Sequence, residues 1–123
     1  MIADVSYRQY VQKKSTDLKK QLISDLKPFK NNSFVIWGNG GLGRSILGVL
    51  SEMGFKNNVK AFCNSTIGED EVLYVDGIQV LPCKKAVYTY QDSFFIIATS
   101  YKKEVIEYMS ENFKDISLKF FCL

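Results

Sequence analysis

The apolar residues at the front of the chain follow a helical spacing. In residues 5–27 apolar side chains recur at roughly helical positions, and Leu18, Leu22 and Leu26 form one edge of that face. Pro28 is expected to end this helix. Because a helix with so small an apolar face is only marginally stable alone, we expect it to pack against the rest of the chain or against a second copy.

Behind this helix, short apolar runs alternate with amphipathic stretches. The predicted strands cover residues 34–37, 59–63, 76–82, 93–100 and 117–123. The predicted helices cover residues 41–55, 83–90 and 101–113. Such alternation implies right-handed crossovers and a parallel sheet. We therefore predict an α/β fold: a small doubly wound parallel sheet of about five strands in the order 3-2-1-4-5, with an extra N-terminal helix. The helix takes residues 1–30 and the α/β domain residues 31–123.

The composition is that of an ordinary globular protein. Of 123 residues, 46% are hydrophobic and 24% charged, and no apolar run reaches the roughly 18 residues that a membrane span needs. The first residues lack the apolar core of a secretory signal, so a cytoplasmic location is expected. Cys63, Cys83 and Cys122 are far apart, which suits reduced core thiols better than disulfides or zinc ligands. There is no histidine, and no metal site is predicted.

The net charge of the chain is +3, and residues 8–30 exceed that value on their own, with seven lysine and arginine residues against two aspartates. Basic helices that bind nucleic acid or membranes carry base-stacking aromatic residues or a large apolar face. Neither is obvious here, so we expect no nucleic-acid partner and no membrane span. The helix is instead expected to contact the domain, a second copy or a catalytic domain.

Four glycines, Gly38, Gly40, Gly41 and Gly43, directly follow the first buried strand. In the pattern G-x-G-x-x-G the first glycine allows a tight turn, the second lets the backbone approach a phosphate, and the third lets the helix lie close to the sheet. A P-loop is disfavoured because Arg44 stands where that motif has lysine. The alternative is a tight turn that binds nothing. The predicted phosphate-binding residues are Gly38, Asn39, Gly40, Gly41, Leu42, Gly43 and Arg44.

Two further strand ends are expected at the same site. About 20 residues beyond the glycines, where NAD-binding domains place an acid that contacts the ribose, this chain has Asn64 and Ser65. The missing acid slightly favours NADP over NAD, with Arg44 as a nearby cation, and fits a nucleotide-sugar equally well. Thr99 and Ser100 end the most apolar strand, and we expect them to line the site without catalysing a reaction.

The segments "VIWGNGGLGRSILGVLSEMGF", "VKAFCNS", "VDGIQVLPCKKAV" and "DSFFIIATS" resemble a known group of domains. These are the small Rossmann-like nucleotide-binding domains at the front of bacterial polysaccharide-biosynthesis enzymes: sugar acyltransferases, FkbM-type methyltransferases and nucleoside-diphosphate-sugar dehydratases. The resemblance covers residues 33–122. It implies NAD(P) or a nucleotide-sugar as ligand, with catalysis in a following domain. The chain departs from the group at Asn64, where an acid is usual, and at Leu42, where the acyltransferases commonly have histidine.

Two function classes therefore remain open. One is a domain that binds a small-molecule nucleotide and is part of, or associated with, an enzyme of polysaccharide or sugar-nucleotide biosynthesis. The other is a Rossmann-like interaction or regulatory module without a bound nucleotide, whose N-terminal helix docks a partner. No catalytic residue is predicted in this chain, and whether the protein is an enzyme stays open.

Overall fold

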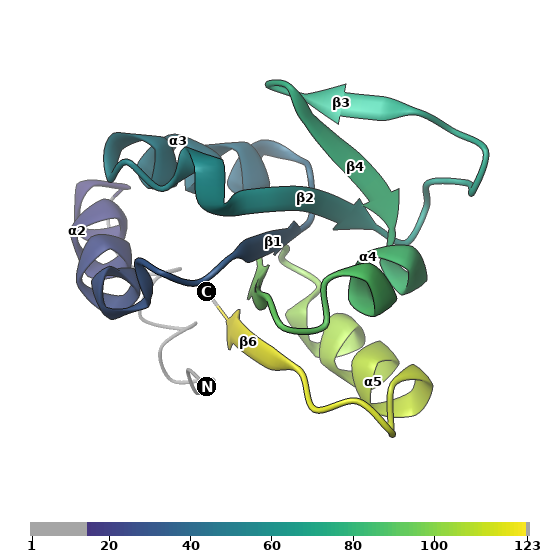
Figure 1. Ribbon diagram of the computed structural model, residues 1–123. Coiled ribbons are helices and arrows are strands. Elements are labelled where there is room, and N and C mark those ends of the chain that lie inside the picture. Colours follow the sequence, from purple (N-terminus) through teal and green to yellow (C-terminus); the bar gives the residue numbers. More distant parts are fainter. Residues whose placement is uncertain (1–14, 123) are drawn as a thin grey trace.

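The computed structural model describes residues 15–122, which form an α/β domain with a mostly parallel sheet (Figure 1). Among these residues, no helix has both the length and the apolar character needed to cross a bilayer. In chain order the elements are α2 (Ser15–Leu26), η1 (Lys27–Phe29), β1 (Phe34–Trp37), α3 (Gly41–Glu52), η2 (Lys56–Asn58), β2 (Val59–Asn64), β3 (Leu73–Val75), β4 (Ile78–Pro82), α4 (Cys83–Thr89), β5 (Phe94–Ile97), α5 (Lys102–Asn112) and β6 (Lys119–Cys122).

The sheet contains one more strand than the sequence predicts. Within the described residues its order is β3-β4-β2-β1-β5-β6. The predicted strands stand in the predicted order and pair in parallel, but the predicted count is wrong because β3 adds an antiparallel edge strand beside β4. Asp76 and Gly77 join β3 to β4 with φ angles of 51° and 82°, the positive values that a two-residue type I′ hairpin turn requires.

The strands β1 and β5 lie side by side at the centre of the sheet. All four residues of each strand are buried, and Phe34 pairs with Phe94 in a parallel register that runs to Trp37 and Ile97. Helices α2 and α3 contribute to the core on one face of the sheet, and α4 and α5 to the core on the other (Figure 1). A continuous apolar run suits a strand that is covered on both sides. The predicted order 3-2-1-4-5 places these two strands side by side, and the structure confirms that they are neighbours.

The N-terminal helix packs on the domain through its leucines. The side chains of Leu22 and Leu26 are 0% exposed and join the core cluster that contains Ile46 and Leu50 of α3. The predicted packing is confirmed for these two leucines. The side chain of Leu18 and the first part of the predicted helix, residues 5–14, lie outside the described part of the chain.

Candidate functional site

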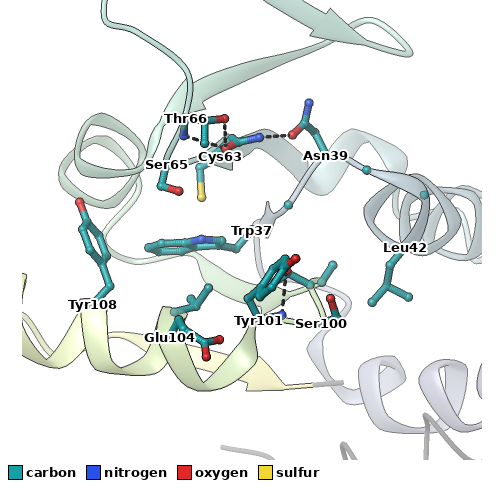
Figure 2. A pocket seen from close by; sticks show the side chains of 17 residues that line it. Trp37, Asn39, Leu42, Cys63, Ser65, Thr66, Ser100, Tyr101, Glu104 and Tyr108 are labelled. Carbon is teal, nitrogen blue, oxygen red and sulfur yellow. Dashed lines mark hydrogen bonds between the residues drawn. The ribbon is translucent and has the colours of Figure 1, made fainter.

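Three loops meet at the carboxyl ends of the central strands. They follow β1, β2 and β5, and because these strands are parallel neighbours, their ends share one edge of the sheet. Between the loops and the start of α5 lies a cleft of about 750 Å³ (Figure 2). Its lining residues are Trp37, Gly38, Asn39, Gly40, Gly41, Leu42, Cys63, Asn64, Ser65, Thr66, Ala98, Thr99, Ser100, Tyr101, Glu104, Val105 and Tyr108.

The first and last glycines of the loop are packed against backbone. Gly38 has φ +114°, a conformation that other residues rarely adopt, and a Cβ there would lie 2.5 Å from the carbonyl oxygen of Ala98. A Cβ on Gly43 would overlap the carbonyl oxygen of Gly38 and approach Ile36. Gly38 thus permits the turn out of β1, and Gly43 permits α3 to lie close to that strand. Both glycines are required by the fold itself.

Neither packing nor backbone conformation explains why the two middle positions, Gly40 and Gly41, are glycine. A Cβ on Gly40 or Gly41 would meet no atom of the described residues within 4 Å. Gly40 has φ −82° and ψ −160°, extended backbone that any residue adopts. Both residues line the cleft. Glycine at these positions leaves the backbone open to the cleft, which is the surface that a closely approaching ligand needs.

Helix α3 begins at this open surface. Gly40 is its N-cap residue and offers no side-chain hydrogen bond, and the N–H of Arg44 donates to the carbonyl oxygen of Gly40 at 3.0 Å as the first helical bond. The preceding N–H groups, of Gly41, Leu42 and Gly43, come too early in the helix to have helical acceptors. Together with the helix dipole they favour an anion at this end of the cleft.

A hydrogen-bonded bridge joins the loops after β1 and β2. The Nδ2 of Asn64 donates to Oδ1 of Asn39 at 2.6 Å, and Oδ1 of Asn64 accepts from both the N–H and the hydroxyl of Thr66 at 2.8 Å (Figure 2). Asn64 therefore stands at the predicted strand end, but its carboxamide is used to tie the two loops. Its oxygen already accepts two hydrogen bonds, unlike the carboxylate that contacts a ribose in NAD-binding domains.

Most of the predicted site residues line the cleft, and two do not. Gly43 is buried beneath the loop, and Arg44 is exposed on α3 outside the cleft. The structure thus does not bring the predicted cation to the site, and no lysine or arginine lines the cleft within the described residues. The predicted residues that do line it are Gly38, Asn39, Gly40, Gly41, Leu42, Asn64, Ser65, Thr99 and Ser100.

The loop after β5 leads into α5, whose first two turns form one wall of the cleft. The N–H of Tyr101 donates to the Oγ1 of Thr99 at 3.2 Å, a local turn that sets the direction of the helix. Tyr101, Glu104 and Tyr108 all line the cleft, although no sequence motif places Glu104 and Tyr108 there. The signal that could have found them is their spacing of three and four residues, which puts them on the same side of a helix.

Trp37 lies at the base of this wall, between the side chains of Cys63 and Ser65 and those of Tyr101 and Glu104 (Figure 2). Its ring meets Tyr108 edge to face, with centroids 6.0 Å apart and an interplanar angle of 72°. The sequence pattern predicts Trp37 only as the last residue of a buried strand. Its position at the strand end, rather than its residue type, is what brings it to the cleft.

Burial raises the pKa of two protonatable side chains that line the cleft, Cys63 of β2 and Tyr108 of α5. Burial, together with a hydrogen bond to Cys83, raises the pKa of the Cys63 thiol well above its usual range. Desolvation, reinforced by the nearby Cys83 and Cys63, also raises the pKa of the Tyr108 hydroxyl. Cys63 and Cys83 are buried free thiols, as predicted, and the side chain of Cys122 lies outside the described ones. Among the described residues that line the cleft, Glu104 is the one acidic or basic residue.

In residues 15–122, no group of three or more histidine, cysteine, aspartate or glutamate side chains is placed to hold a metal ion. The resemblance to nucleotide-binding domains of polysaccharide-biosynthesis enzymes stays a prediction, because the chain matches no family model, no curated protein and no solved structure.

Proposed function

We propose that this protein is a Rossmann-like nucleotide-binding domain whose cleft holds NAD(P) or a nucleotide-sugar. The observation that carries the proposal is the open backbone at Gly40 and Gly41, where neither packing nor conformation requires glycine. The cleft at this point has the volume of a small-molecule site and lies at the strand ends where open α/β sheets bind ligands.

In this proposal the phosphates lie against the start of α3. The N–H groups of Gly41 and Leu42 donate to the phosphate oxygens, and the helix dipole adds a favourable field. A cationic side chain is not needed for this mode of binding, which agrees with a described lining that holds no lysine or arginine. The remainder of the ligand extends across the end of β1 toward Trp37 and Tyr101.

The residues that line the cleft also favour some of the candidate ligands over others. A 2′-phosphate at the end of β2 would lie near Asn64, where the described lining offers no cation to neutralise it. This placement favours NAD or a nucleotide-sugar and reverses the slight preference for NADP that the sequence suggests. The proposed place of the domain in polysaccharide or sugar-nucleotide biosynthesis rests on the sequence resemblance alone.

A thermal-shift panel of NAD, NADP, UDP-sugars, CMP, ATP and S-adenosylmethionine tests the proposal. A ligand present at about 100 times its Kd stabilises the folded state by about 2.7 kcal/mol, a clear rise in Tm. We expect NAD or a UDP-sugar to raise the Tm of the wild type and to leave that of Gly40→Val unchanged. A panel without any shift would contradict the proposal and favour the interaction module that docks a partner through its N-terminal helix.

A further inference from the structure

The two halves of the cleft differ in chemistry. The loops after β1 and β2 supply backbone N–H groups and small polar side chains, of which Asn39 and Ser65 are examples. The half formed by β5 and α5 supplies aromatic rings and one carboxylate, that of Glu104. A ligand that spans the cleft must therefore present an acceptor-rich group at one end and a different kind of group at the other.

Glu104 is a carboxylate that has no hydrogen-bond or ion-pair partner among the described residues. It is exposed and lines the cleft. An acid in the first turn of a helix also favours the helix dipole, which is the structural explanation for its presence. That explanation applies to any acid on this turn, whereas facing the cleft gives Glu104 a direct effect on the charge of a bound group.

The aromatic side chains beside Glu104 offer surfaces suited to a flat or ring-shaped group. Tyr101 is 69% exposed, and its side chain lines the cleft together with those of Trp37 and Tyr108 (Figure 2). Exposed aromatic rings lie against the apolar faces of other rings, and the carboxylate accepts hydrogen bonds from groups at the ring edge. A second anion on the ligand would meet the like charge of Glu104 with no described cation in the lining to offset it.

We propose that the α5 half of the cleft binds a ring of the ligand that donates hydrogen bonds to Glu104, and that Glu104 excludes ligands carrying a negative charge on that ring. This inference rests on the proposed function, because it assigns the distal part of the same ligand. Sugar hydroxyls and the carboxamide of a nicotinamide share the required chemistry. The experiment therefore covers both sources with ligand pairs that differ by one carboxylate.

Calorimetric titration measures the affinity of the full chain for the two pairs. UDP-glucose is compared with UDP-glucuronic acid, and NAD with nicotinic acid adenine dinucleotide. For the pair that binds, we expect the wild type to favour the member without the carboxylate by at least about threefold, the size of a partly exposed charge interaction. Glu104→Gln keeps the shape of the side chain, and it should bring the two affinities within about twofold of each other.

Glu107→Gln is the matched control, because Glu107 is an exposed acid on the same helix outside the cleft. It should retain the wild-type preference. Equal affinities in the wild type, or a preference that persists in Glu104→Gln, would overturn the role of Glu104 and leave the proposed function standing. If none of the four ligands binds the wild type, the proposed function fails and the inference fails with it.

Discussion

Gly38 and Gly43 differ from Gly40 and Gly41 in their surroundings, although all four belong to one loop. A side chain on either of the first two would collide with backbone, whereas a side chain on either of the other two would meet open space. Packing within the fold therefore explains why Gly38 and Gly43 are glycine, but it does not explain Gly40 and Gly41. A glycine motif is evidence of binding only where the chain itself has no need for glycine, and here that condition is met at Gly40 and Gly41, which line the cleft.

The largest effect on stability is expected for Gly43→Ala. The added Cβ would overlap the carbonyl oxygen of Gly38, so α3 must move away from β1. Overpacking of this kind costs about 3 kcal/mol of unfolding free energy. Chemical denaturation measures the change. Gly48→Ala is the control, because Gly48 lies in the same helix with open space around it, and alanine there should stabilise the protein by about 0.5–1 kcal/mol.

Equal stabilities of Gly43→Ala and the wild type would mean that α3 can shift freely, and the division of the loop into two kinds of glycine would be lost.

Gly38→Ala should have the next largest effect. Its backbone has φ +114°, and the new Cβ would lie 2.5 Å from the carbonyl oxygen of Ala98. Strain and crowding together should lower the unfolding free energy by about 2 kcal/mol. Thermal unfolding followed by circular dichroism measures this loss. A Tm equal to that of the wild type would show that the turn out of β1 does not depend on glycine.

Asn64→Asp is expected to lower the unfolding free energy by less than Gly38→Ala does, and also to change the affinity for the nucleotide. It removes the amide that donates to Asn39, a loss of about 1 kcal/mol of unfolding free energy. The added negative charge should weaken the binding of NADP more than that of NAD. Thr66→Val is the uncharged control, since it removes a hydrogen bond to Asn64 without adding charge. If both variants change the ratio of NADP to NAD affinity equally, the charge at this strand end has no part in ligand selection.

Gly40→Val should have the smallest effect on stability and a large effect on binding. The side chain enters open space, and the cost is that valine is a poorer N-cap than glycine, so the unfolding free energy should fall by no more than about 1 kcal/mol. The same side chain would occupy the position of the phosphates and abolish nucleotide binding. Calorimetry on Gly40→Ala and Gly40→Val should give graded losses. Wild-type affinity in the valine variant would make the loop a turn and nothing more.

The central part of the fold was predictable because its sequence signals are unambiguous. The runs that contain Phe34 and Phe94 are apolar at every position, which only a strand buried on both faces explains. The strand β3 was missed because Leu73 and Tyr74 are exposed and the strand has only three residues. Its signal was the Asp76-Gly77 pair, a strong hairpin signature that lies inside the strand predicted over residues 76–82.

The part of the candidate site formed by the glycine loop was predictable, because a sequence motif marks it. The part formed by side chains on helices was less predictable, because no motif shows which way those side chains point. The glycine loop locates the cleft, but the placement of Arg44 depends on helical phase. Gly43 packs on β1, and the next residue is turned by about 100° around the helix, which carries Arg44 to the surface. The α5 wall was missed because Glu104 and Tyr108 belong to no motif, and only their spacing from Tyr101 connects them with the cleft.

The most direct test of nucleotide binding at the glycine loop is an NMR titration of the 15N-labelled protein with the ligand that gives the largest thermal shift. The largest amide shift changes should fall on Gly38, Gly40, Gly41 and Leu42, with smaller changes at Thr99 and Tyr101 across the cleft. Changes centred on α2 or on the β3 edge, or no change with any nucleotide at millimolar concentration, would contradict nucleotide binding in this cleft.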